Sequence, residues 1–477
     1  MAESVRSQLL HGVAWNFLEK VLIRGVSFFI GVVLARLLSP SDYGLIGMLV
    51  VFISISNVFI DGGLTKALIQ RNNSQDVDFS TAFVTNVVMS LVVYLILFIS
   101  APWISAFYNE PILTLLTRIL SLNFILGSFN IVQRAKLVAK VDFKSLAKIN
   151  VMSTIVSGLV GITMAYEGAG VWALVGQTLS STLVLIFIFP VYSKWTPSIK
   201  FSKNSFNQLF GFGSKLMATG VYSVILSNIS TICIGRYYRS SQLGFYTRAS
   251  QFSEMISSVM FDVLGNVTFP VLSHLQDERA KLIAVYRKSL FLTAMIIFPL
   301  MILCALLARP MVLLLLTEKW LPCVVLMQWL FLAKMVTPLS AINMNILNAI
   351  GRSDLYMKLD FSKAPLILIV LAITIPIGVE AITIGSFCTS FICFFVNAYL
   401  PGRIFGYGAI QMLKDWRFIF VSLGIMVITV MIYLYFIINP WMQLIGGTLI
   451  GCGVYVLCGY MLKILDDDIL RMLKIKK

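Results

Sequence analysis

An apolar run from Val13 to Leu38 that carries basic side chains within it constrains this chain more than any other feature. The run is long enough to cross a bilayer, because a membrane helix needs about 20 mostly apolar residues. Its polar residues recur at steps of three or four, which places them on one face of a helix. They are Asn16, Lys20, Arg24, Ser27 and Gly31. The pattern predicts a helix that is apolar toward lipid and cationic toward the inside of the protein.

The two cations of this face have different interpretations. A charge at the bilayer centre costs about 2.5–3.5 kcal/mol on insertion scales, so such residues usually face a cavity and mark a pathway. Arg24 fits this interpretation, because it lies deep in the run. Lys20 lies nearer the start, where a long side chain reaches the membrane surface, and this alternative stays open beside a binding role.

Composition assigns the whole chain to the polytopic membrane class. Its 477 residues are 58% hydrophobic and 12% charged, with a mean hydropathy of +0.90. A soluble chain carries about twice that charged fraction. The net charge of +16 lies in short loops, so membrane topology accounts for it and nucleic acid is not an expected partner. The seven cysteines form no CxxC motif, and six lie in apolar segments, so no metal site is expected.

Hydrophobic runs of membrane-spanning length predict an all-α fold with about 14 transmembrane helices. The expected spans are 13–38, 43–62, 79–101, 112–133, 147–165, 170–190, 208–235, 244–270, 288–308, 323–348, 361–378, 380–400, 417–438 and 441–463. The connections between them are short, which leaves no room for a water-exposed domain.

Basic residues are distributed unequally between the two sides of this topology. With the N-terminus inside, 26 of the 37 Lys and Arg lie in cytoplasmic segments and five lie outside. Because positive charge marks the cytoplasmic side, both termini are predicted to be cytoplasmic. An even number of spans agrees with this orientation.

Three short similarities recur along the chain in the same order and at a slowly growing offset, which indicates an internal repeat. They are RLLSPSDYG at 36–44 with RYYRSSQLG at 236–244, Lys140-Val-Asp142 with Arg352-Ser-Asp354, and GVWALVG at 170–176 with GVEAITIG at 378–385. The repeat unit contains six spans, so the two copies are parallel. The predicted organisation is an N-lobe at 1–200, a C-lobe at 201–405, and two further helices with a cytoplasmic tail at 406–477.

Further polar residues within the spans extend the candidate substrate site. Arg118 lies in the fourth span, Arg248 in the eighth, and Lys334 and Asn345 on a polar stripe of the tenth. Guanidinium groups bind phosphate in a bidentate manner, so an excess of arginine at depth predicts an anionic substrate, phosphate or pyrophosphate. For the asparagines, interhelical packing is the alternative.

Three acidic residues are candidates for ion coupling, namely Glu254, Asp262 and Asp61. Glu254 is the deepest of them. It either carries a coupled proton or sodium ion or pairs with a basic residue, and pairing is the favoured interpretation. Beyond such an ion gradient, no cofactor is expected.

Several stretches of the sequence are similar to a known family. They are LARLLSPSDYGLIGM at 34–48, GGLTKALIQR at 62–71, KVDFKSLAKI at 140–149, and GFYTRASQF with FPVLSHLQ within 244–276. Together they resemble the polysaccharide transporter family. This is the Wzx-type flippase branch of the multidrug/oligosaccharidyl-lipid/polysaccharide exporter superfamily, and the likeness is to colanic-acid or teichuronic-acid exporter types. It covers most of the first twelve spans.

The resemblance implies a bacterial inner-membrane protein with two six-helix bundles and two C-terminal helices. It implies transport of an undecaprenyl-diphosphate-linked oligosaccharide to the outer leaflet by alternating access, for lipopolysaccharide or exopolysaccharide synthesis. Arginine on the first helix is among the functional residues of this superfamily, and Arg24 matches that position. The implied partners are this lipid-linked oligosaccharide, membrane lipids, and the polysaccharide polymerase and assembly machinery.

Two other functions are weighed against transport of a lipid-linked oligosaccharide. A cation-coupled multidrug antiporter of the same superfamily needs an acidic or aromatic cavity, and the basic stripe argues against it. A membrane glycosyltransferase or polymerase needs acid and base residues and usually a large outer loop. The outer loops here, such as 105–111 and 439–443, are short and hold no catalytic cluster, so no enzyme is expected.

Overall fold

A computed structural model of the chain describes residues 20, 22–61, 76–140, 142–195, 198, 200–276 and 278–462. Every regular element within these ranges is a helix. The all-α class predicted from the hydrophobic runs is therefore confirmed. The chain divides into two compact units, residues 1–244 and 245–477, and each is described by itself.

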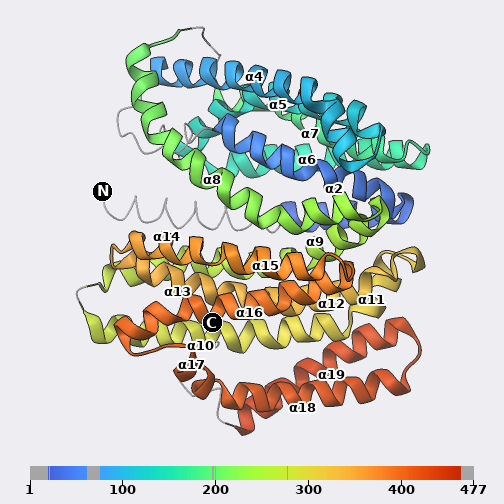
Figure 1. The fold of residues 1–477 in the computed structure, drawn as a ribbon, viewed down its shortest axis with the longest axis vertical. Helices are drawn as coiled ribbons and strands as arrows, with labels where there is room; N and C mark the ends of the chain where they lie inside the picture. The colour runs from blue at the N-terminus through green and yellow to red at the C-terminus, as the bar shows by residue number, and fades with distance from the viewer. Residues whose placement is uncertain are drawn as a thin grey trace. The chain divides into compact units, whose positions relative to one another are not determined.

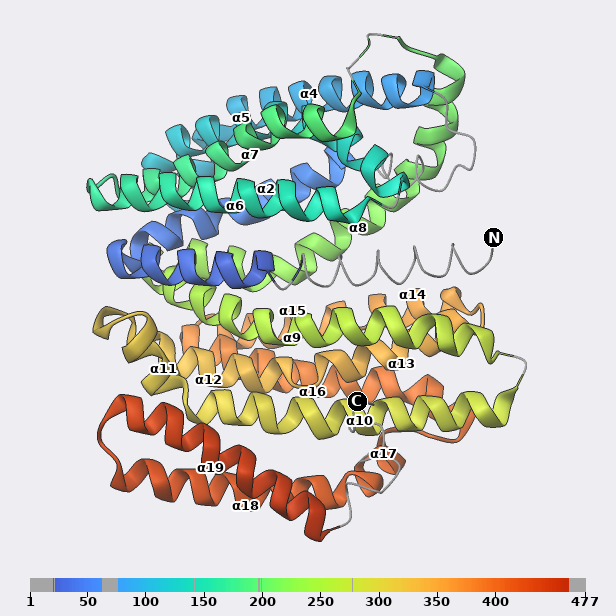
Figure 2. The same cartoon turned by 180° about the vertical axis from the view of Figure 1, so that it is seen from behind.

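The first unit is a bundle of long helices (Figures 1 and 2). A helical segment at 22–37 precedes them. The others are α2 (Pro40–Asp61), α4 (Asp76–Tyr108), α5 (Ile112–Ala139), α6 (Phe143–Tyr166), α7 (Val171–Ser193) and α8 (Lys203–Tyr237). Helix α5 packs on α4 and α7, α6 packs on α7, and α8 packs on α2 and α4.

The second unit begins within α9 (Ser240–His274). Its other helices are α10 (Arg279–Leu306), α11 (Ala308–Leu315), α12 (Cys323–Lys334), α13 (Thr337–Ala349), α14 (Ser353–Ser362), α15 (Ala364–Thr374), α16 (Val379–Phe405), α17 (Ala409–Asp415), α18 (Arg417–Phe436) and α19 (Pro440–Met461), with a 3₁₀ turn at Glu318–Trp320. Helix α16 packs on α12, α13 and α15, while the α18–α19 hairpin packs on α10 and α11.

Eleven helical stretches within the described ranges are long and apolar enough to cross a membrane, and one of them runs through both α12 and α13. All of them coincide with predicted spans. Helix α4 extends beyond its predicted span at both ends, and α10 extends beyond its predicted span at the N-terminal end. The predicted first, eighth and eleventh spans correspond to the helical segment 22–37, to α9 and to α15. The total of 14 stays a prediction.

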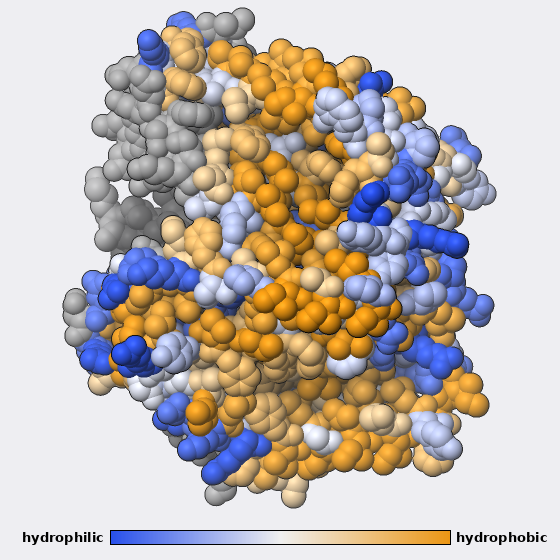
Figure 3. All heavy atoms as spheres, viewed as in Figure 1, coloured by the Kyte–Doolittle hydropathy of each residue, from blue (hydrophilic) through white to orange (hydrophobic). Residues whose placement is uncertain are grey.

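Apolar side chains cover outward faces that a water-soluble protein would bury. Ile428, Met431 and Ile432 on α18 and Leu449 and Val456 on α19 are each more than half exposed. Figure 3 shows the apolar side chains that gather over the α18–α19 hairpin. Because large exposed apolar surfaces are stable only against lipid or a partner, these faces mark the chain as a multi-pass membrane protein.

The lobe boundaries predicted from the repeat do not coincide with the boundary between the compact units. Helix α8 would open the predicted C-lobe, yet it packs on α2 and α4 in the first unit. The division at 200 and 405 follows sequence similarity, whereas the division at 244 follows packing. The three-part organisation stays a prediction.

The repeat matches coincide with helix starts. Helix α2 begins at Pro40 and α9 at Ser240, within the first matched pair of segments. Helices α7 and α16 follow Gly170 and Gly378, and both glycines have positive φ, at 56° and 150°. A side chain rarely adopts such a backbone, so the matched glycines are required by the turn that starts each helix.

The first matched pair also forms a reciprocal backbone contact within the first unit. A Cβ atom built on Gly44 would lie 1.7 Å from the carbonyl oxygen of Ser240, and one on Gly244 would lie 1.8 Å from that of Pro40. The N-terminal turns of α2 and α9 therefore cross at a distance that only glycine permits. Such close approach lets Cα–H groups contact carbonyl oxygens, as at small-residue helix crossings in membranes.

We expect Gly44→Ala to destabilise the protein by about 1–3 kcal/mol, because the added methyl group cannot enter without moving the backbone of α9. Thermal unfolding of the purified protein in detergent measures the effect. Gly127→Ala on α5 is the matched control, since a Cβ there meets nothing within 4 Å. Equal melting temperatures for the two variants would contradict the steric requirement.

The predicted tenth span is interrupted in the middle. Two turn residues, Met335 and Val336, separate α12 from α13. The physical reason is Pro338 in the first turn of α13, which has no N–H to donate to the carbonyl of Lys334. The hydroxyl of Ser257 on α9 donates to that carbonyl instead, at 3.4 Å. The polar stripe that was predicted across this span is consequently divided between two helices.

Candidate functional site

The helical segment 22–37 presents different residues on opposite sides. Leu22, Phe29 and Val33 are 43%, 70% and 39% exposed, on the side suited to lipid. Arg24 is two residues from Leu22, and so on nearly the opposite side of the helix, where it is half-buried. This arrangement agrees with a helix that is apolar toward lipid and cationic on its other side.

Apolar packing holds this segment in place within the first unit. Ile30, Leu34 and Leu38 recur at steps of four and pack with Ala173 and Leu174 of α7. These residues lie about two to four turns beyond Arg24, so the packing of this face fixes the rotation of the helix that carries it. Lys20 is half-buried and one turn nearer the N-terminus.

Arg118 on α5 contacts the neighbouring helix α4. Its Nε donates to the carbonyl oxygen of Phe98 at 3.4 Å. Its Cζ lies 4.3 Å from the centroid of the Phe98 ring. A cation over an aromatic ring and a backbone carbonyl gives the guanidinium a packing role. The structure thus supplies Arg118 with protein partners on α4, and its predicted role in substrate binding stays untested.

Arg248 on α9 is almost fully enclosed, with 5% of its surface exposed. One guanidinium nitrogen, Nη1, donates to Oε1 of Gln251 at 2.6 Å. Gln251 is one turn further along the same helix and is exposed. Gln251 is itself one turn before Glu254 on the same helix.

Glu254 and Lys334 form an ion pair between α9 and α12 in the second unit. Their side chains are 53% and 30% exposed, near the middle of α9 and at the end of α12. Charged groups that are exposed at the middle of membrane helices face an aqueous space more favourably than hydrocarbon. The favoured interpretation of Glu254 as a partner for a basic residue agrees with this contact.

Exchanging the two charges tests the pairing. We expect Glu254→Lys and Lys334→Glu each to destabilise the protein, because each variant places like charges in contact. The double variant should recover about 1 kcal/mol, the upper range for a partly exposed pair. Thermal unfolding of all four proteins gives the coupling. If the loss of stability in the double variant equals the sum of the losses in the two single variants, the two groups do not interact.

Three asparagines within the predicted spans form hydrogen bonds to neighbouring helices. Thr182 on α7 donates from Oγ1 to Asn123 Oδ1 at 2.6 Å, and its carbonyl accepts from Asn130 Nδ2 at 3.4 Å. On α13, Asn343 is fully buried and accepts from the hydroxyl of Tyr286 at 2.7 Å. Asn345, the predicted substrate ligand, is half-buried, and no hydrogen bond joins its side chain to another described residue.

Several predicted site residues lie outside the part of the chain that the structure describes. They are Asn16 and the side chains of Asp61 and Asp262. Among the described candidates, the structure brings together Glu254 and Lys334 in the second unit, while Arg248 bonds Gln251. The partner of Lys334 is 80 residues away in sequence, and periodicity within one helix carries no signal for such a pairing.

Comparison with known proteins identifies the family. A family model described as polysaccharide biosynthesis protein matches residues 33–325, more than half of the chain. The chain belongs to this family. The resemblance that the sequence motifs indicated is confirmed.

Two curated members of this group are similar over much of their length. The teichuronic acid biosynthesis protein TuaB of Bacillus subtilis is 24% identical, over 75% of this chain and 74% of that protein. The succinoglycan biosynthesis transport protein ExoT of Rhizobium meliloti is 25% identical, over 65% of this chain and 62% of that protein. At this identity the names of the relatives indicate a class of function.

The fold is similar to that of a solved flippase. The lipid II flippase MurJ in an inward closed conformation superposes with a TM-score of 0.73 at 14% identity, covering 95% of this chain and 98% of that one. A likeness at this identity shows a common fold. It places this family member in a fold class with polytopic transporters.

Proposed function

We propose that this protein transports an undecaprenyl-diphosphate-linked oligosaccharide from the inner to the outer leaflet of the bacterial inner membrane. The family, the transport protein among its relatives and the flippase fold support this assignment. The observation that carries it is Arg24, a guanidinium within a membrane helix on the side away from the lipid-facing residues. A cation held there is suited to an anionic head group.

The chemistry required of the site is recognition and release. A guanidinium binds two oxygens of a diphosphate at once, and it stays charged at all physiological pH values. The polyprenyl tail remains in lipid while the head group passes through the protein by alternating access of the two lobes. No bond is made or broken, which is why no catalytic residue, metal or organic cofactor enters the proposal.

The second unit also provides polar groups for binding the head group, namely those of Arg248, Glu254 and Lys334. The ion pair leaves Lys334 close to charge balance in the absence of substrate. An anionic head group would compete with Glu254 for the ammonium group of Lys334. Binding of the head group is therefore linked to release of the Glu254 carboxylate from Lys334. A sodium or proton gradient, or the membrane potential at about 2.3 kcal/mol per charge per 100 mV, is the proposed energy source.

Orientation and partners complete the proposal. The charge distribution supports cytoplasmic termini. A substrate of this class is made in the inner leaflet and consumed outside, so polysaccharide polymerase and assembly machinery are the proposed neighbours. The antiporter alternative shares the fold, but an arginine on the substrate side of the first helix disfavours cationic drugs.

We expect Arg24→Ala to reduce transfer of a labelled undecaprenyl-diphosphate oligosaccharide in reconstituted vesicles by about tenfold or more. Loss of one charge-assisted contact costs about 1.5–3 kcal/mol, which corresponds to that factor. Arg24→Lys should retain part of the activity, because it keeps the charge and loses the bidentate geometry.

Arg417→Ala is the matched control, since Arg417 is exposed and stacks on Phe418 of the C-terminal hairpin. Its transfer rate should equal that of the wild type. Wild-type transfer that persists in Arg24→Ala would keep the function and remove Arg24 from the site. Absence of transfer by the wild type, together with efflux of a cationic drug, would favour the antiporter.

A further inference from the structure

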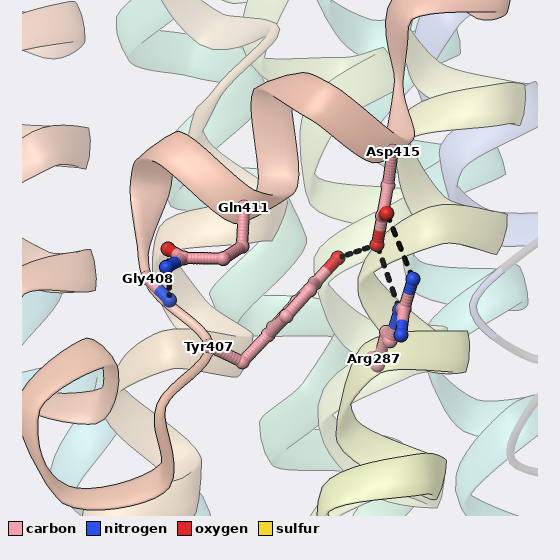
Figure 4. A network of polar contacts seen from close by, with 5 residues as sticks. All are labelled: Arg287, Tyr407, Gly408, Gln411 and Asp415. Atoms are coloured by element: carbon pink, nitrogen blue, oxygen red, sulfur yellow. Dashed lines mark hydrogen bonds and ion pairs between the residues drawn. The ribbon is translucent and has the colours of Figure 1, made fainter.

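A polar network joins α10 to the short helix α17 in the second unit. Both oxygens of Asp415 accept from Arg287, from Nε at 2.7 Å and Nη2 at 2.8 Å. The hydroxyl of Tyr407 donates to the same carboxylate at 2.7 Å. Figure 4 shows the three side chains converging, with Gly408 and Gln411 at the start of α17 nearby. Burial and then the bond to Asp415 raise the pKa of Tyr407, so it stays a donor.

A hollow of about 620 Å³ opens beside this network. Ala280, Ala284 and Lys288 line it at steps of four along α10, and Ile283 and Phe291 line the adjacent stripe. The two alanines create the space, because a larger side chain at either position would fill it. Arg287 and Asp415 form its polar edge, and they largely neutralise one another.

Unlike Arg287, Lys288 has no anionic partner among the residues that the structure describes. Within the ranges that the structure describes, no ion pair or hydrogen bond of its side chain occurs, and it is exposed. Lys414 on α17 and Arg417 at the start of α18 are exposed close by in sequence to Asp415. Among the charged residues that line the hollow itself, Arg287 and Lys288 outnumber Asp415, and the rest of the lining is apolar.

The depth of the hollow follows from the sequence of the helices around it. After Lys288, α10 holds no charged residue to its end, and α18 and α19 hold none after Arg417. Helix α17 exposes Ile410 at 68% and Leu413 at 38%. Short helices of this kind lie in the membrane interface, so the hollow lies at the level of the lipid head groups.

We propose that this hollow binds an anionic glycerophospholipid. The phosphate contacts the ammonium group of Lys288, the glycerol and head group lie over Ala280 and Ala284, and an acyl chain descends past Phe291. Basic pockets between membrane helices bind anionic head groups in this way. The excess of cations favours a lipid with net negative charge over a zwitterionic one. The residues that line the hollow do not include Glu254 or Lys334 of the same unit.

Native mass spectrometry of the full-length protein in detergent tests the proposal, by titration with phosphatidylglycerol and, in parallel, with phosphatidylcholine. The wild type should bind phosphatidylglycerol more tightly. Lys288→Ala should weaken that binding by about fivefold, since each basic residue near a charged lipid contributes on the order of 1 kcal/mol. Ala284→Phe should weaken binding of both lipids, because it fills the hollow and leaves the charge in place.

Lys281→Ala is the matched control. Lys281 is on the same helix and exposed, but it pairs with Glu278 and does not line the hollow. Its lipid affinity should stay within about twofold of the wild type. An equal loss in Lys281→Ala, or full affinity in Lys288→Ala and Ala284→Phe, would overturn the site. If inorganic pyrophosphate binds saturably and abolishes the preference for phosphatidylglycerol over phosphatidylcholine, the hollow is a site for a free phosphate compound instead.

Thermal unfolding of each variant in detergent separates lost binding from lost folding. Lys288 and Ala284 are on the outward side of α10, and neither substitution removes a residue of the Arg287–Asp415 contact. Melting temperatures near that of the wild type are therefore expected. A variant that unfolds is replaced by Lys288→Gln or Ala284→Leu, for which the same ratios of affinity decide the outcome.

Discussion

The close crossing of two helix starts is the constraint on which the described architecture most depends. At Gly44 and Gly244 the backbones of α2 and α9 meet without any side chain between them. Hydrophobic burial cannot draw helices together inside lipid, because lipid tails are as apolar as the side chains. Contact of this kind has to come from close packing and from backbone groups. The reciprocal geometry also explains why the motif around these glycines occurs twice in the chain.

Several polar groups elsewhere in the described helices have partners on a neighbouring helix. Thr182 forms hydrogen bonds with two asparagines of α5. Ser257 donates to the carbonyl that Pro338 leaves without an N–H donor, and Glu254 forms an ion pair with Lys334. Each contact joins two helices, so the residues that satisfy polar groups also fix the packing. Arg24 is on a helix that apolar residues further along anchor to α7.

Much of this could be predicted from the sequence. Length and hydrophobicity gave the helical membrane class, and the spacing of polar residues gave the side on which Arg24 lies, because both signals are local. The contacts of Glu254 with Lys334 and of Arg287 with Asp415 join residues 80 and 128 positions apart, and no local pattern specifies them. Pro338 was a sequence signal for a break in the tenth span, but the apolar period across it concealed the effect. The hollow at Lys288 depends on two alanines, which are unremarkable until their neighbours are known.

Lys334 is attached to α9 twice, by its ammonium group to Glu254 and by its carbonyl to Ser257. It is also the last residue of α12, directly before the break that precedes α13. A negatively charged molecule that drew the ammonium group away from Glu254 would leave only the long carbonyl contact across this joint. Binding of an anion to Lys334 would then loosen the joint between α12 and α13. The same residue would both bind the anion and hold the joint against α9.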